Sequence, residues 1–464
     1  MAESLRIMAF RPLVGDRAIR HARSVTEIRL TDHIPSPPPE QPTPRFARRP
    51  HPAWIVAAVG FVALLGAAAF RSVPSVLMDP LHEEFGWSHG TIGAAVSVNM
   101  LLYGVISPFA AALMDRFGIR LVVACALLLV AAGSGLTVFM TQPWQLMATW
   151  GLLVGVGVGS MSMPFVATIT GRWFVRHRGL VTGVLTAAGA TGQLVFLPLV
   201  SMLARDHGWR APALVVAATA LAVVPLVVLF IRDFPGDIGR TAYGAGPGSD
   251  AGLRTVAAGG AARALTVLAA IVRRPVFWLL AGGFAICGAS TNGLIGTHFV
   301  SAAHDHGMPP TTAAGLLATV GIFDVAGTIA SGWLTDRIGS RYLLTMYYAL
   351  RGLSLLILPM LFAPDVRPSM WVFVIFYGLD WIATVPPTVA LCREHFGADG
   401  PIAFGWVFAS HQIGAAIAAS GAGVIRDVQG SYQPAWFIAG GLCAVAAVMS
   451  LSIRQPRPRE ALAQ

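Results

Sequence analysis

Long apolar runs with little charge dominate this chain and restrict its possible folds more than any other feature. A membrane-spanning helix needs roughly 20 apolar residues, and about twelve runs of that length follow one another from Ala53 onward. The runs are continuous and do not alternate between apolar and polar residues, which favours helices over strands. Hydrophobic residues make up 55% of the chain and charged residues 12%, too apolar a balance for a soluble protein. The sequence therefore predicts an all-α membrane protein.

The expected spans form two groups of six, separated by a polar, glycine-rich loop. They are 53–77, 92–114, 119–140, 145–169, 179–203 and 211–231, then 276–300, 312–334, 341–362, 370–391, 403–425 and 434–453. The predicted domains are a tail (1–52), a six-helix bundle (53–231), a central loop (232–274), a second six-helix bundle (275–454) and a short tail (455–464). The first tail is rich in arginine and proline, which predicts disorder. No apolar core follows its first arginines, so it is not a secretory signal.

Arginine placement predicts the orientation. If the N-terminus lies inside, the inside segments hold 26 arginines and the outside loops hold 4. The positive-inside rule then places both tails and the central loop in the cytoplasm, with the chain crossing the membrane many times. This topology also accounts for the net charge of +10 without a nucleic-acid partner.

Two short turns repeat 221 residues apart, one in each half. Asp115-Arg116 lies within Ala111–Arg120, and Asp336-Arg337 lies within Gly332–Arg341. Related halves are a common way to build a secondary transporter. We expect each carboxylate to complement the positive end of the helix that follows it, near residues 119 and 340. We expect the arginines to pair with acids of neighbouring loops, so that the pairs open and close the cytoplasmic side. The alternative is that the turns only fix topology.

These turns carry a family resemblance. Residues 336–341, with Gly332 before them, and residues 115–118 resemble the loop motifs of the major facilitator superfamily, although Ala111 replaces an expected glycine. Phe85–Ser88 and Arg172–Leu180 resemble the bacterial relatives of the monocarboxylate transporters, including oxalate/formate antiporter-like members. The resemblance covers about residues 53–454. It implies twelve helices in two pseudo-symmetric bundles, and transport by alternating access.

Charged residues inside the spans are the first candidates for function. A charge in hydrocarbon costs about 2.5–3.5 kcal/mol even on lenient scales. Arg71 can grip a carboxylate with two parallel hydrogen bonds. Asp324 and Asp380 are candidates for proton coupling, because burial favours the protonated form of a carboxylate. The alternative for each is a structural ion pair, and for Arg351 we favour a salt bridge to Asp380.

The family resemblance adds two expectations. Arg71 aligns approximately with a lysine that the animal monocarboxylate transporters use in substrate binding and proton coupling. Asp324 lies where those transporters carry an aspartate. They carry an arginine four residues later, where this chain has Thr328.

Uncharged polar residues complete the predicted substrate site. In the family fold the seventh span lines the cavity, so Asn292 and His298 could hydrogen-bond an anion. His411 and Gln412 in the eleventh span are similar candidates. The alternative for all of these residues is helix packing.

The sequence thus predicts a secondary transporter, coupled to protons, for a small organic anion such as a monocarboxylate. It carries no Walker loop, nucleophile elbow or His-Glu-x-x-His motif, so we expect no enzyme activity and no cofactor. His304-Asp305-His306 lacks further ligands at metal spacing, so no metal is expected. We expect a monomer in the lipid bilayer. The alternatives are an exporter of hydrophobic or drug-like compounds and a carrier-like membrane sensor.

Overall fold

The structure, a computed structural model, describes residues 51–69, 74–87, 89–246 and 259–454. The chain divides into two units, Met1–Arg49 and Pro50–Gln464. The first unit lies outside the described residues, as do the tail 455–464 and Arg71. The predictions made for these parts therefore remain predictions.

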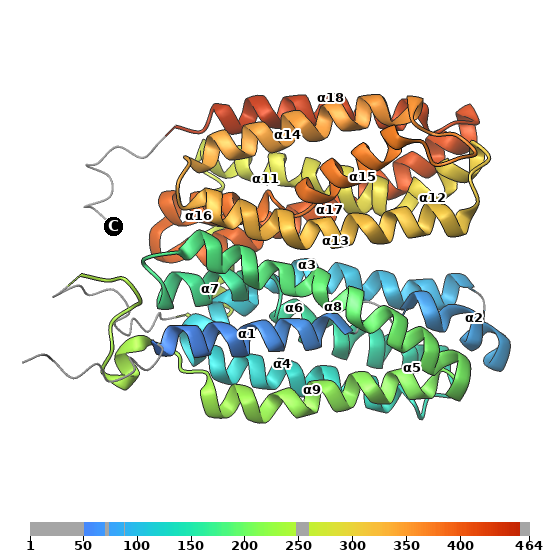
Figure 1. Cartoon of the computed structure of the whole chain (residues 1–464). Coiled ribbons are helices and arrows are strands. Elements are labelled where there is room, and N and C mark those ends of the chain that lie inside the picture. Colours follow the sequence, from blue (N-terminus) through green and yellow to red (C-terminus); the bar gives the residue numbers. More distant parts are fainter. Residues whose placement is uncertain (1–50, 70–73, 88, 247–258, 455–464) are drawn as a thin grey trace, which may run out of the picture. The chain divides into compact units, whose positions relative to one another are not determined.

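The first half of the described chain is a set of long helices. In order they are α1 (Pro52–Ala69), α2 (Pro74–Phe85), α3 (His89–Phe117), α4 (Ile119–Thr137), α5 (Pro143–Leu146), a π-helical stretch (Met147–Val154), α6 (Gly155–Ser160), α7 (Met163–Trp173), α8 (Arg178–His207) and α9 (Arg210–Phe230). They form the lower group in Figure 1.

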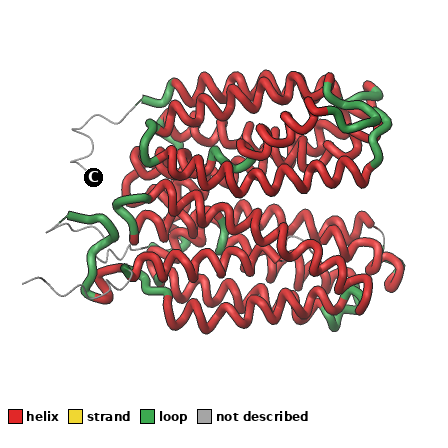
Figure 2. Tube along the Cα trace, viewed as in Figure 1, coloured by secondary structure: helices red, strands yellow, loops and turns green. Residues whose placement is uncertain are grey.

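The second half follows a short helix in the central loop. The 3₁₀ turn Pro235–Ile238 and α10 (Ala262–Ile271) belong to that loop. Then come α11 (Pro275–Gly288), a π-helical stretch (Ala289–Ile295), α12 (Gly296–Asp305), α13 (Pro310–Thr335), α14 (Ser340–Ile357), α15 (Pro368–Asp380), α16 (Val385–Phe396), α17 (Gly400–Gln429) and α18 (Gln433–Leu451). The view coloured by secondary structure shows helices joined by short loops in both halves (Figure 2).

Proline and glycine set several of these helix boundaries. Proline occupies the first turn of α11, α13 and α15, where its missing N–H has no helical partner to lose. At the other end, Gly430 adopts φ 72° and ends α17, a left-handed conformation that costs glycine little. The sequence thus starts and stops the spans with local signals.

The observed helices confirm the predicted fold class. Within the described residues, 10 helices or runs of consecutive helices are long and apolar enough to cross a membrane. One run, Pro368–Gln429, contains two expected spans, and the shorter apolar helix Pro52–Ala68 lies where the first span is expected.

Each half packs around its own core. In the first bundle α4 packs on α9 and α1 packs on α8, and in the second α14 packs on α18 and α11 packs on α17. The bundles meet mainly along two helix pairs, α8 with α13 and α3 with α17, with smaller contacts of α7 with α17 and of α8 with α16. We call this contact surface the seam. The end of the seam that carries the two Asp-Arg turns is called the turn end.

A shared hydrophobic cluster joins the bundles near the turn end. Its members from the first bundle include Ala111, Ala112, Met163 and Ala167. From the second bundle it includes residues of α16 and α17, among them Phe404. The seam at this end is therefore filled with apolar side chains.

Candidate functional site

Three described spans depart from regular α-helical geometry. In the first bundle the fourth span contains the π-helical stretch Met147–Val154. In the second bundle the seventh span contains the π-helical stretch Ala289–Ile295, and the tenth is broken between α15 and α16. Interrupted helices leave backbone groups available for ligands, and such breaks often mark transport sites.

A buried ion pair stands at the break of the tenth span. Arg351 of α14 donates from Nε to Asp380 Oδ2 at 2.6 Å, with both side chains nearly inaccessible to solvent. The Arg351 guanidinium also donates to the carbonyl oxygens of Asp380 and Trp381, and to Cys287 Sγ at 2.9 Å. The expected salt bridge between Arg351 and Asp380 is therefore present. It also satisfies carbonyl groups that the break would leave unpaired.

Asp324 of α13 holds the other side of the same break. Its Oδ1 accepts hydrogen bonds from Ile382 N at 3.0 Å and from Thr328 Oγ1 at 2.9 Å, and the residue is 2% exposed. Ile382 follows Asp380 by two residues, so Asp324 lies beside the pair of Arg351 and Asp380. Three spans thus bring two carboxylates and one guanidinium together around a single helix break.

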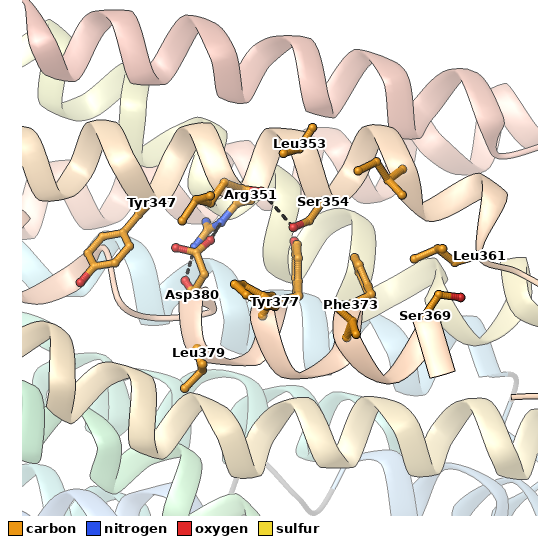
Figure 3. Close-up of a pocket in the computed structure, with 14 residues that line it drawn as sticks. Tyr347, Arg351, Leu353, Ser354, Leu361, Ser369, Phe373, Tyr377, Leu379 and Asp380 are labelled. Atoms are coloured by element: carbon orange, nitrogen blue, oxygen red, sulfur yellow. Dashed lines mark hydrogen bonds and ion pairs between the residues drawn. The ribbon is translucent and has the colours of Figure 1, made fainter. Parts of the chain in front are cut away.

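An apolar groove runs from this cluster along α14 and α15. It has a volume of about 510 Å³, and its walls are mainly apolar side chains of these helices, including Leu353 and Phe373 (Figure 3). Tyr347, Arg351 and Asp380 lie toward one end of the groove, and Leu361 and Ser369 lie toward the other. All of the lining residues belong to the second bundle, so this groove is separate from the seam.

The uncharged candidates lie in different surroundings. His298 bonds through Nε2 to the Ala419 carbonyl at 2.8 Å and through Nδ1 to the Tyr432 hydroxyl at 3.3 Å, so it ties α12 to α17 and to the residue before α18. Asn292 is exposed within the π-helical stretch of the seventh span.

The two candidates in the eleventh span lie near the seam. His411 is buried, with its ring centroid 5.0 Å from that of Phe284. Gln412 is partly buried, and its side chain lies against Gly104 of α3 in the other bundle.

Asp336 makes a direct polar contact across the seam at the turn end. Its two carboxylate oxygens accept hydrogen bonds from Gly179 N at 2.7 Å and Leu180 N at 3.0 Å. These N–H groups belong to the first turn of α8, where the helix dipole favours a negative charge. The second bundle thus caps a helix of the first.

Asp115 is held differently. Its oxygens accept from Arg172 Nη2 at 2.8 Å and from Arg263 Nη1 at 3.1 Å. The same Arg263 donates from Nη2 to Asp399 Oδ1 at 2.5 Å. Arg172, Arg263 and Asp399 were not identified from sequence. The signal that could have found Arg263 is the helical spacing of the apolar residues after it, Ala264, Val267 and Ile271.

The prediction that each turn acid complements the N-terminal end of the helix that follows it was wrong. Asp336 caps α8 instead of α14, and the start of α4 is met by Asp233, whose Oδ1 accepts from Arg120 N at 2.9 Å. The glycine between α3 and α4 explains this contact, because a Cβ on Gly118 would clash with the Asp233 carboxylate. The physical reason for the error is that a helix end attracts any carboxylate the fold brings near, regardless of sequence distance.

The turn arginines are also placed differently from expectation. Arg337 stacks over the Trp333 ring at 3.7 Å and donates to the Trp333 carbonyl, at the end of the helix that precedes it. Arg116 lies over the ring of Phe117 and approaches Gly260 of the central loop. The interloop pairing expected of the arginines is instead made by Arg172 and Arg263.

The fold and this set of contacts define a class of protein: a multi-pass α-helical transporter with two bundles. The sequence model of the Major Facilitator Superfamily matches residues 59–400. The chain therefore belongs to the Major Facilitator Superfamily, and it is a membrane transporter and not an enzyme.

Comparisons with individual proteins agree with this family. The chain is 26% identical over 403 residues to the uncharacterized MFS-type transporter YcxA of Bacillus subtilis (strain 168), covering 82% of this chain and 90% of the relative. It is 28% identical over 351 residues to monocarboxylate transporter 13 of Bos taurus, covering 75% of this chain and 76% of the relative. The resemblance to monocarboxylate transporters is thereby confirmed.

Solved structures show the same fold. The fucose:proton symporter FucP of E. coli matches with a TM-score of 0.66 at 17% identity, covering 88% of this chain and all of the other. The proton:xylose symporter XylE matches with a TM-score of 0.66 at 15% identity, covering 89% and 99%. At these identities the match establishes the fold alone.

Proposed function

We propose that this protein carries a small organic anion, such as a monocarboxylate, across a bacterial inner membrane together with a proton. The bundles 53–231 and 275–454 rock against each other, and both tails and the central loop 232–274 face the cytoplasm. The monocarboxylate transporters among the relatives support the class of cargo. Two solved structures that share this fold are proton symporters, which is consistent with proton coupling here.

The observation that carries this proposal is the carboxylate of Asp324 at the break of the tenth span. It accepts the Ile382 N–H, so its state affects the geometry of the break. It also has a second carboxylate, Asp380, and one guanidinium, Arg351, as neighbours. Two acids and one base make a cluster that favours an added proton, because a lone buried carboxylate is costly to keep charged.

The substrate side of the proposal rests on sequence. Arg71 binds the carboxylate, since a guanidinium matches its planar geometry. Asn292, His298, His411 and Gln412 supply hydrogen bonds or shape the cavity. Of these, Asn292 is the most accessible, and it lies in an interrupted helix.

Asp115, Arg116, Asp336 and Arg337 form the proposed cytoplasmic gate. The two acids provide the contacts, and the arginines shape the turns around them. Asp336 bonds to N–H groups of α8 in the other bundle, and this bond must break when the turn end opens. Alternating access requires contacts of this kind, which form in one state and are absent in the other.

The test is uptake of labelled small carboxylates into proteoliposomes, with and without an inward proton gradient. Asp324→Asn is expected to abolish gradient-driven accumulation while exchange of labelled for unlabelled cargo continues, because exchange needs no net proton movement. Arg71→Gln is expected to abolish both processes. Asp365→Asn, an exposed acid in the loop before α15, is the matched control and should leave both unchanged.

A second variant separates the two acids. Asp380→Asn alone would leave Arg351 without its carboxylate partner, and removing one partner of a buried pair costs about 3–5 kcal/mol. The double variant Asp380→Asn/Arg351→Gln removes both charges. If it folds and still accumulates cargo with the gradient, Asp380 does not carry the proton. Failure of folded wild-type protein to accumulate any carboxylate would contradict the monocarboxylate proposal and favour export of hydrophobic compounds.

A further inference from the structure

We propose that α10, the short helix of the central loop, is a latch that holds the two bundles together at the turn end, with Arg263 as its positioning residue. This inference goes beyond the proposed gate and rests on the proposed alternating access. Neither the motif residues nor the family resemblance includes Arg263.

The first observation is that one guanidinium bridges both bundles. Arg263 Nη1 lies 3.1 Å from Asp115 Oδ2, at the end of α3, and Nη2 lies 2.5 Å from Asp399 Oδ1, directly before α17. α3 and α17 face each other across the seam. The two acids are drawn together by a single cation that belongs to neither bundle.

The second observation is that α10 itself fills the seam. Its apolar face (Ala264, Val267 and Ile271) is buried in the hydrophobic cluster that also contains Ala111 of α3 and Phe404 of α17. Trp406 of α17 donates from Nε1 to the Ala264 carbonyl at 3.0 Å. Arg263 and the apolar face of α10 therefore both contact the first bundle at α3. They also both contact the second bundle, at α17 or at the residue before it.

The third observation concerns how the loop is anchored. Before α10, Tyr243 N donates to the Trp173 carbonyl at 2.8 Å and its own carbonyl accepts from Val175 N at 2.8 Å, which fixes the loop to the first bundle. After α10, Arg274 donates to the His395 carbonyl at 2.9 Å in the second bundle. α10 thus lies between an attachment to each bundle.

These contacts make opening costly in a defined way. When the turn end opens, α3 and α17 separate, and Arg263 can remain with Asp115 or with Asp399 but not with both. Asp115 retains Arg172 in either case, because that pair lies within the first bundle. Opening therefore breaks one of the two ion pairs of Arg263 and exposes the apolar face of α10. Side-chain exposures of 19% for Arg263 and 42% for Asp399 limit the effect to about fivefold in the open-to-closed ratio.

The experiment measures that ratio directly in lipid nanodiscs without cargo. Spin labels replace Leu121 on α4 and Ile338 in the second turn, both exposed and in opposite bundles, in a chain whose four cysteines are serine. Pulsed dipolar spectroscopy then gives the populations with short and long label distances. Arg263→Gln is expected to raise the long-distance fraction relative to the short by about fivefold.

Controls separate the latch from general effects on the loop. Arg273→Gln removes the same charge from an exposed position directly after α10 and should leave the ratio unchanged. Asp399→Asn and Trp406→Phe each remove one contact of α10 and should shift the ratio in the same direction as Arg263→Gln. They keep the test decisive if Arg263→Gln fails to fold.

Two results would overturn the proposals, and they differ. Equal ratios in wild type, Arg263→Gln and Asp399→Asn, with both distances populated, would exclude the latch and leave alternating access intact. A single distance in every variant, in Asp336→Ala, and with cargo added would contradict alternating access itself.

Discussion

The two Asp-Arg turns share a sequence motif but differ in what they hold. Asp336 reaches across the seam and accepts two backbone N–H groups of α8 directly. Asp115 stays within its own bundle, paired with Arg172, and reaches the other bundle only through Arg263 of the central loop. One turn is a direct contact between bundles, whereas the other is part of a charge network with the loop as intermediary.

The difference teaches that pseudo-symmetry of sequence does not give symmetry of contacts. α17 in the second bundle corresponds to α8 in the first. If the first turn mirrored the second, Asp115 would cap α17. Asp399 already occupies the residue before α17, so a second carboxylate there would add like charge. The central loop resolves this by supplying Arg263 between the two acids. We therefore expect the two turns to respond to mutation with different readouts.

The largest effect is expected where helix backbones touch. A Cβ on Gly183 would lie 2.5 Å from the Thr328 carbonyl oxygen, so Gly183→Val prevents α8 from approaching α13. Overpacking costs about 3 kcal/mol, and the labelled protein should then populate almost entirely the long distance. Gly189→Val in the same helix, where no heavy atom lies within 4 Å, should behave as wild type. If Gly183→Val still populates mainly the short label distance, the contact between α8 and α13 does not form the gate.

The second-largest effect is expected at the first Asp-Arg turn, where Asp115 is part of the charge network. Asp115→Asn leaves the nearly buried Arg172 without a charged partner, with side-chain exposures of 10% and 14% in the pair. We expect the free energy of unfolding to fall by about 2 kcal/mol, measured as a lower melting temperature in a fixed detergent. The label distances should change less than in Asp336→Ala, because the pair with Arg172 is present in both states. A large population shift with unchanged melting would contradict the comparison.

The second turn, where Asp336 contacts the other bundle directly, should show the reverse: a larger change in label distances and a smaller change in melting temperature. Asp336→Ala removes the acceptor for Gly179 N and Leu180 N, which are accessible to water once freed. Charge-assisted hydrogen bonds of this kind contribute about 1.5 kcal/mol, so the open-to-closed ratio should rise by roughly tenfold. The melting temperature should change little, because each bundle keeps its core. Asp365→Ala, in an exposed loop at the opposite end, is the control.

The smallest effect is expected away from the seam. Glu84 of α2 accepts from Arg210 and from Trp209 Nε1, and these hydrogen bonds hold the pKa of its carboxyl below the usual range. Its contribution to stability is present above the ordinary pKa of glutamate and is lost as the pH falls through the lowered folded value. The pair is exposed, so the coupling between Glu84→Gln and Arg210→Gln should stay below about 1 kcal/mol.

This pair joins α2 to α9 of the same bundle, so it also tests the comparison. Melting temperatures at neutral pH and at about pH 3 give the coupling and its loss. The label distances should be identical in wild type and both variants. A shift in distances would mean that the opposite end also controls the seam.

Local chemistry explains how much of the candidate site could be predicted. Arg351 and Asp380 are opposite charges in apolar spans, and each needs a partner there, so their pairing followed from the cost of burying charge. Asp324 was found for the same reason. Its bond to Ile382 N could not be predicted, because it depends on the break of the tenth span approaching α13.

Arg263 shows the limit of such reasoning. It lies in a polar loop, where an arginine is ordinarily solvated and indicates no partner. Its importance depends on the separation of Asp115 and Asp399, which are far apart in the chain and come together only when α3 packs on α17. The same limit applies to Asp336. The sequence predicts that it complements α14, the next helix along the chain, whereas it caps α8.

The sequence by itself determined the membrane-length apolar runs, their grouping into two sets of six and the charges that need an explanation. These follow from the hydrophobic length of a membrane and from the cost of placing charge within it. Only the tertiary structure decided which helix end each turn acid caps, which arginine bridges the bundles and where the tenth span breaks. The physical reason is that hydrogen bonds and ion pairs act over a few ångströms, so they are set by which helices pack together and not by the order of residues along the chain.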